Sequence, residues 1–250
     1  MDNMRIMLTP AMSKRLIALG ICTLECVREK LKKGVIVICG GTTNGYVAEE
    51  LLKLINEDIG ALKYEMHRGV TLPHGIKTKK AENADIVIID GKWERALSIT
   101  DVVDSLSEGD IVIKGGNAVY PKNGEVGVII GNPAGGTLMN VVKASYGKRA
   151  KIIAPVGLEK RVYIPISDIM ELVNEPGMKG ERIGLLPAKA YTEIEAISDL
   201  TCADATLIAA GGVMGAEGAL WMQVIGEKED IARMNEIYAA LIDTENFTQK

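Results

Sequence analysis

The residues with the clearest chemical potential form a glycine-rich turn, Gly40-Gly41-Thr42-Thr43-Asn44-Gly45, between an apolar run at 35–39 and a segment of helical periodicity. A strand that turns directly into a helix leaves backbone N–H groups unpaired at the helix N-terminus, where the helix dipole also favours negative charge. Glycine lets a ligand approach the backbone closely, and threonine and asparagine add hydrogen-bonding groups. The turn therefore predicts a site for a small phosphorylated or otherwise anionic metabolite.

The same turn also has a purely structural interpretation. It matches neither the Walker motif G-x-x-x-x-G-K-[ST] nor the dinucleotide motif G-x-G-x-x-G, and its polar residues could simply cap the helix. Two further glycine-rich turns follow apolar runs, however, and parallel strands deliver their carboxyl ends to one edge of a sheet. We therefore expect all three turns to surround one crevice. The predicted ligand contacts are Gly40, Gly41, Thr42, Thr43, Asn44, Gly115, Gly116, Asn117, Gly131, Asn132, Gly135, Gly136 and Thr137.

Several ionisable residues lie at the ends of the apolar runs. Proton transfer next to a carbonyl needs a carboxylate and a cation that stabilises the oxyanion. Asp90 is the first candidate for the carboxylate and Glu125 the second, while Lys114 could supply the cation. Alternatively, Asp90 could anchor a loop and Lys114 could be a solvated strand-end lysine. The charged run 159–161 could reach the far end of a ligand or could be a solvated surface segment.

The elements that must position these residues follow an alternating pattern. Residues 10–33 have the periodicity of a long amphipathic helix, which Gly34 would end. Continuous apolar runs of strand length are typical of parallel strands buried on both faces. Their alternation with helices predicts an α/β fold with a mostly parallel sheet and flanking helices. The strands are predicted at 35–39, 85–90, 110–114, 126–130 and 151–156.

After residue 157 the pattern changes. A strand is predicted at 183–187, a helix at 191–200, a strand pair at 205–210 and 219–225, and a helix at 228–242. This β-α-β-β-α order predicts a smaller α+β lobe. We therefore expect an α/β ligand-binding domain at residues 1–160 and a small lobe at 161–250.

Composition excludes several classes of protein. The formal charge of −4 and the lack of a basic stripe argue against nucleic acid as a partner. No apolar run reaches the roughly 18 residues that span a bilayer, and we see no secretion signal. The four cysteines do not have the paired spacing of metal ligands. We expect a cytoplasmic protein that binds neither membrane nor nucleic acid and uses no metal or cofactor.

The run 12–47, from Met12-Ser13-Lys14-Arg15 through Val35-Ile36-Val37-Ile38-Cys39 and the glycine turn, resembles the opening of ribose-5-phosphate isomerase type A. Ile89-Asp90-Gly91 and Ile113-Lys114-Gly115-Gly116 resemble two later motifs of that family. The run 110–131 is also similar to translation-initiation-factor-2B-like proteins and to the sugar-phosphate-sensing domains of DeoR-type regulators. All belong to the superfamily of glucosamine-6-phosphate deaminases and coenzyme A transferases. The resemblance, over residues 12–156, implies this α/β fold, a phosphorylated ligand and a possible homodimer.

The chain departs from the isomerase motifs at the positions that carry catalysis. Two acidic residues expected after Asp-Gly are replaced by Lys92-Trp93-Glu94, and a glutamate and a lysine are replaced within 117–121. Three hypotheses follow: an isomerase-like enzyme acting on a sugar phosphate, a non-catalytic metabolite sensor on the same fold, and acyl transfer from coenzyme A through Glu217.

Overall fold

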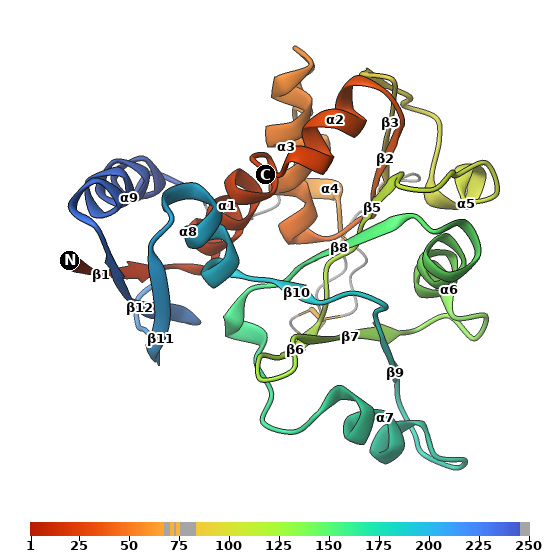
Figure 1. Cartoon of the computed structure of the whole chain (residues 1–250). Helices are drawn as coiled ribbons and strands as arrows, with labels where there is room; N and C mark the ends of the chain where they lie inside the picture. The colour runs from red at the N-terminus through yellow and green to blue at the C-terminus, as the bar shows by residue number, and fades with distance from the viewer. Residues whose placement is uncertain (68–70, 73, 76–83, 246–250) are drawn as a thin grey trace.

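A six-stranded sheet runs through the centre of the structure, a computed structural model that describes residues 1–67, 71–72, 74–75 and 84–245 (Figure 1). Its strand order is β10-β8-β5-β2-β3-β4. Strands β2, β5, β8 and β10 are parallel, whereas β3 runs antiparallel to β2, and β4 runs antiparallel to β3. The bounds are β2 Val35–Ile38, β3 Ile86–Ile89, β4 Lys92–Trp93, β5 Ile111–Ile113, β8 Lys151–Pro155 and β10 Ala190–Tyr191. The α/β class is thus confirmed, but the sheet is mixed and parallel only across four strands.

Two three-stranded antiparallel sheets flank this sheet (Figure 1). One has the order β6-β7-β9, formed by β6 Ala118–Tyr120, β7 Glu125–Ile130 and β9 Arg182–Leu185. The strand predicted at 126–130 therefore exists but lies outside the main sheet. The other has the order β1-β12-β11, formed by β1 Asp2–Leu8, β11 Asp204–Gly211 and β12 Ala219–Gly226.

Helices cover both faces of the main sheet. The helices predicted after the glycine turn, at 191–200 and at 228–242 are present, but the long helix predicted at 10–33 is interrupted. It breaks after Ile21, where the Thr23 hydroxyl donates a hydrogen bond of 2.7 Å to the carbonyl of Gly20. The helices are α1 Pro10–Ile21, α2 Glu25–Lys32, α3 Thr42–Leu54, α4 Leu62–Glu65, α5 Ile99–Val102, α6 Gly136–Val142, the π-helical turn η1 Lys143–Gly147, the 3-10 turn η2 Leu158–Lys160, α7 Ile166–Asn174, α8 Glu193–Thr201 and α9 Lys228–Leu241.

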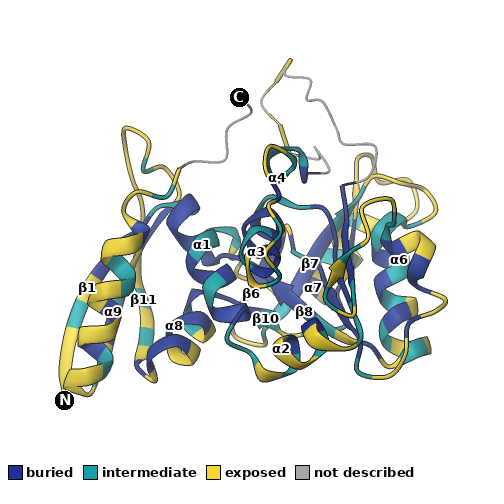
Figure 2. Ribbon diagram, turned by 90° about the horizontal axis from the view of Figure 1, so that it is seen from above, coloured by how far each residue is buried: buried dark blue, intermediate teal, exposed yellow. Residues whose placement is uncertain are grey.

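The core has two parts because successive residues of each strand point to opposite faces. Ile36 and Ile38 belong to the larger core with α1, α3 and α8, whereas Val37 belongs to the core under α5 and α6. Figure 2 shows buried residues concentrated where α1 packs against α3. Both faces are thus buried, which explains the continuous apolar runs that predicted these strands.

Strand pairing crosses the expected domain boundary near residue 160. Strand β1 pairs with β12, β7 pairs with β9, and β8 pairs with β10. The division into residues 1–160 and 161–250 therefore stays a prediction. No helix in the described part of the chain is long and apolar enough to cross a membrane.

A close contact between α1 and α8 gives a first test of this architecture. A Cβ added at Gly20 would lie 2.9 Å from the Cα of Ala196 and 2.5 Å from the hydroxyl of Tyr191. We expect Gly20→Ala to lower the free energy of unfolding by roughly 1–3 kcal/mol, because backbone on the facing helix must move. The matched control is Gly147→Ala in η1, where the nearest atom outside the turn's backbone is 4.0 Å away. Urea denaturation of both variants checks the packing, and equal stabilities would contradict it.

Candidate functional site

The carboxyl ends of the four parallel strands meet at one edge of the sheet, which we call the carboxyl edge. It is formed by residues 39–44 after β2, 114–117 after β5, 156–160 after β8 and 192–193 after β10. Because β3 runs in the opposite direction, its first residues, not its last, reach this edge. Parallel sheets place ligands in this position in many α/β proteins.

The first glycine turn leads into α3 as the sequence predicted. Gly41 is the N-cap residue in an extended conformation, and the first helical hydrogen bond runs from the N–H of Gly45 to the carbonyl of Gly41. Glycine has no side chain with which to cap the helix. The Thr43 hydroxyl is buried and has no hydrogen-bond partner among the described residues. The start of α3 thus combines helix N–H groups with a buried, unpartnered hydroxyl.

Asn44 connects this turn to the next strand. Its side chain is fully buried, and Nδ2 donates to the carbonyls of Cys39 (2.6 Å) and Ile113 (3.2 Å). Oδ1 has no hydrogen-bond partner among the described residues and faces Gly115, where an added Cβ would lie 3.5 Å from it. Turns 40–45 and 115–116 are therefore neighbours, as predicted, and Asn44 also joins β2 to β5.

Two lysines bind the carbonyls of Gly115 and Gly116, and a third lies near one of them. Lys114 is buried, and its Nζ donates to the carbonyl of Gly115 at 2.8 Å. The Nζ of Lys160 donates to the carbonyl of Gly116 at 3.2 Å. The third is Lys14 of α1, whose pKa is lowered by burial and by the nearby ammonium of Lys160. The carboxyl edge therefore has a concentration of positive charge next to the start of α3.

Two glutamates lie beside these lysines. Glu193 begins α8, is fully buried, and accepts a hydrogen bond from the N–H of Leu158 at 3.0 Å through Oε2. Its Oε1 and the Oε2 of Glu159 have no hydrogen bond of normal geometry among the described residues. Burial raises the pKa of Glu193 to about 7, and the Glu159 carboxylate contributes in the same direction, whereas nearby N–H groups and the Ser13 hydroxyl oppose the shift.

The sequence drew attention to Glu159 and Lys160 only as one of two alternatives, and Glu193 was missed. Glu193 follows the two-residue strand β10 and begins a helix whose capping box is Thr192 with Glu195. A Thr-x-x-Glu signal of this kind marks a helix start but does not distinguish a buried glutamate at the first position from an exposed one. The pairing of β10 with β8, which brings Glu193 to Leu158, has no signal in the sequence.

The prediction that Asp90 lies in the crevice is wrong. Because β3 is antiparallel to β2, Asp90 reaches the opposite edge, where its Oδ1 accepts a hydrogen bond from the N–H of Gly34 at 2.8 Å. Its place at the carboxyl edge is taken by Asp85 at the start of β3. The carboxylate of Asp85 accepts hydrogen bonds from the N–H groups of Gly40 (2.8 Å) and Ile99 (3.2 Å).

Glu125 and Asn117 also bind backbone groups of the protein itself. Glu125 accepts a hydrogen bond from the N–H of Ile166 at the start of α7 (2.7 Å) and another from the Asn123 amide (3.0 Å). These interactions, led by the Asn123 hydrogen bond, lower the pKa of Glu125. The Asn117 Oδ1 accepts the N–H of Ile129 at 3.0 Å. Both residues therefore hold the β6-β7-β9 region together, and the structure gives no support for Glu125 as the acid–base or for Asn117 as a ligand contact.

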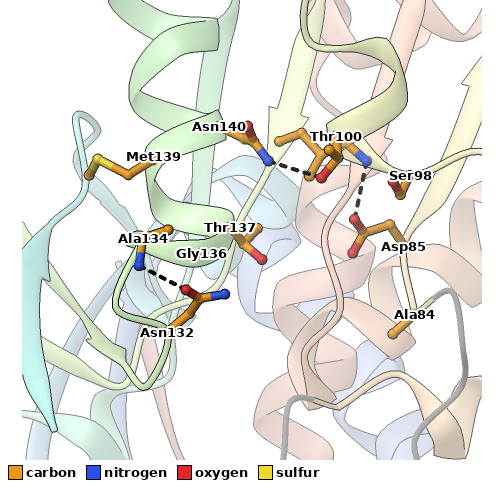
Figure 3. A pocket seen from close by; sticks show the side chains of 11 residues that line it. Ala84, Asp85, Ser98, Thr100, Asn132, Ala134, Gly136, Thr137, Met139 and Asn140 are labelled. Atoms are coloured by element: carbon orange, nitrogen blue, oxygen red, sulfur yellow. Dashed lines mark hydrogen bonds between the residues drawn. The ribbon is translucent and has the colours of Figure 1, made fainter.

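The third glycine turn borders a separate cavity of about 500 Å³ (Figure 3). From this turn, Asn132, Gly136 and Thr137 line it, whereas Gly131 and Gly135 do not, and none of residues 41–44 does so either. The described lining residues are Ala84, Asp85, Ser98, Ile99, Thr100, Asn132, Ala134, Gly136, Thr137, Met139 and Asn140. The single crevice that we expected is therefore a lysine-rich edge and a polar cavity, connected where Asp85 binds Gly40.

Two other sequence hypotheses concern groups away from this edge. Glu217, the candidate for acyl transfer, is exposed in the connection between β11 and β12, where it accepts the N–H of Gly215. Within the residues described by the structure, no three or more histidine, cysteine, aspartate or glutamate side chains are grouped so that they could hold a metal ion.

Comparisons of this chain with protein-family models, with curated proteins and with solved structures find no match. The interpretation of the site therefore depends on its own geometry.

The hydrogen bonds of Asn44 give a second test. We expect Asn44→Ala to lower the free energy of unfolding by roughly 2–4 kcal/mol, because it removes two buried side-chain hydrogen bonds and creates a small void. The control is Asn140→Ala, which removes one accessible hydrogen bond to Thr100 and should cost less than about 1 kcal/mol. Chemical denaturation measures both, and a near-neutral Asn44→Ala would show that Asn44 does not hold the strands together.

The raised pKa of Glu193 gives a third test. From about 4.5 in the unfolded chain to about 7 in the folded protein, the folded state binds more protons, so stability must fall as pH rises through that interval. Glutamine is neutral at every pH and can still accept the Leu158 hydrogen bond. We therefore expect Glu193→Gln to gain stability relative to wild type by roughly 3 kcal/mol between pH 4.5 and pH 8. Urea denaturation across pH checks this, with exposed Glu181→Gln as control; parallel wild-type and Glu193→Gln curves would contradict it.

Proposed function

We propose that the carboxyl edge binds a small phosphorylated or otherwise anionic metabolite. The observation that carries this proposal is the contact of Lys114 and Lys160 with Gly115 and Gly116 after β5, with Lys14 close enough to Lys160 for their charges to interact. The formal charge of the chain is −4, so this concentration of positive charge does not follow from its overall composition. Clustered cations beside a helix N-terminus attract anions and raise their local concentration.

The start of α3 supports the same ligand chemistry. Its first N–H groups offer hydrogen bonds to the oxygens of an anion. A phosphate accepts such bonds through several oxygens at once, and bonds of this type are stronger than those between neutral groups. The anion would then lie between the start of α3 and the lysines.

The neighbouring cavity supports a ligand that also carries hydroxyl groups. Its walls present the amides of Asn132 and Asn140, the hydroxyl of Thr137 and the carboxylate of Asp85 (Figure 3). A cavity of this size suits a small metabolite, and polar side chains of these types bind sugar hydroxyls. A sugar phosphate with its phosphate at the lysines and its hydroxyls toward Asp85 would use both regions. A sugar phosphate is also the ligand implied by the sequence resemblance to ribose-5-phosphate isomerase type A and its superfamily, and we propose the fold of that superfamily for the chain.

Two versions of the function differ in chemistry. An isomerase-like enzyme needs a carboxylate near the bound sugar, and Glu159 lies at the carboxyl edge beside Lys160, with 3.9 Å between Oε1 and Nζ. A metabolite sensor needs only the binding groups. Because Asp90 and Glu125 bind backbone N–H groups elsewhere, the enzyme version depends on Glu159.

Binding measurements with ribose 5-phosphate, ribose and inorganic phosphate test the proposal. We expect ribose 5-phosphate to raise the thermal unfolding temperature more than either part does alone. Lys160→Gln should weaken ribose 5-phosphate binding about tenfold, equivalent to 1.4 kcal/mol, because one charged donor is lost. Lys179→Gln, at an exposed position beyond α7, is the matched control.

The outcomes separate the alternatives. If no member of the phosphate panel stabilises the protein, or if Lys160→Gln and Lys179→Gln behave alike, the proposed site is wrong. Binding with aldose–ketose conversion detected by NMR, and its loss in Glu159→Gln, identifies the enzyme version. Binding without conversion identifies the sensor.

A further inference from the structure

Two carboxyl oxygens face the same small space beside Gly157. A methyl group at Gly157 would overlap Glu159 Oε2 and would lie 3.0 Å from Glu193 Oε1. Both oxygens are buried and lack a hydrogen bond of normal geometry to other described residues. Gly157 has φ −75° and ψ 147°, which any residue can adopt. Glycine is therefore needed here because a side chain would collide with the two carboxyl groups, and not because of the backbone conformation.

The other oxygens of the pair have partners. Glu193 Oε2 accepts the N–H of Leu158, and Glu159 Oε1 lies 3.9 Å from the Nζ of Lys160. Two ionised oxygens directed at one buried space would repel each other, whereas a single proton between them turns the repulsion into a hydrogen bond. Two cations act on Glu159: Lys14 of α1, through its charge, and Lys160 of η2, whose Nζ lies 3.9 Å from Oε1.

We propose that Glu159 and Glu193 share one proton, and that anion binding at the adjacent lysines is coupled to the uptake of this proton. The second part depends on the function proposed above. In the free protein, the lysines favour a doubly ionised pair in part of the population. A bound anion neutralises the positive charge of the lysines. The two carboxylates are then no longer stabilised by that charge, and the pair takes one proton from solvent. One O–H bond forms on either glutamate, and no other bond changes.

In this pair, Glu193 is the residue that holds the proton, and Glu159 is the residue next to the bound anion. The Glu193 side chain is fully buried, whereas Glu159 is 16% exposed and contacts Lys160. Burial raises the pKa of Glu193 to about 7, so the shared proton binds and leaves in the neutral range. The anion affinity should therefore fall as pH rises above about 7, because the required proton becomes scarce.

Sulfate is the probe for this coupling, because it stays dianionic at neutral pH and cannot take up the proton itself. Calorimetric titration near pH 7 in bis-Tris and in Tris, which are not anions and differ in ionisation enthalpy, reports the protons bound per sulfate. We expect uptake of up to one proton in the wild-type protein. Glu159→Gln and Glu193→Gln should bind sulfate with almost no uptake, while the exposed control Glu181→Gln should match wild type. Binding without proton uptake in the wild type would overturn the coupling.

A measurement without ligand separates failure of this inference from failure of the proposed function. In glutamate-labelled protein, carboxyl carbon NMR should show two coupled titration steps for the pair, one of them near neutral pH, and each single glutamine variant should leave one step. If sulfate does not bind, the proposed function and the coupling are both wrong. The NMR titration then still tests whether the two glutamates share a proton. Two independent steps at ordinary glutamate values would overturn the shared proton.

Discussion

The carboxyl edge depends on the hydrogen bonds from the Asn44 amide to the carbonyls of Cys39 and Ile113. They hold the ends of β2 and β5 together at the place where the chain leaves one strand for α3 and the other for Gly115. Because the side chain belongs to the first turn of α3, the same bonds fix the helix start relative to both strands. The relative position of the two glycine turns therefore depends on one buried amide, whose donors are fully engaged while its oxygen faces Gly115.

Around this amide the protein keeps unusual polarity in its interior. Lys114 and Glu193 are both buried, and such groups lose solvation energy that only partners in the protein can replace. The partners are backbone groups released where strands end, such as the carbonyl of Gly115 and the N–H of Leu158. Strand ends supply these groups because they leave the sheet ladder, which explains how Lys114 and Glu193 can be buried at this edge.

The sequence predicted local structure well and spatial relations only in part. The apolar runs located β2, β3, β5 and β8, and the glycine turn located the start of α3. Strand direction, however, has no local signal, so the apolar run at 85–90 predicts a parallel strand and places Asp90 at the edge where Asp85 is found. Strand pairing has no local signal either, and for this reason the sequence did not indicate Glu193. Its burial depends on the pairing of β10 with β8, which are more than thirty residues apart. Strand β1 was missed because its partner β12 is more than two hundred residues away in the sequence.

The pairing of β1 with β12 also has a consequence for biosynthesis. Met4 lies opposite Val224, so the sheet on which α8 and α9 pack cannot close until β12 has left the ribosome. Pairing between segments so distant in sequence slows folding, and until then the apolar side of β1, with Ile6 and Leu8, stays without its cover. The emerging polypeptide thus presents an unpaired, aggregation-prone strand until β12 has been synthesised.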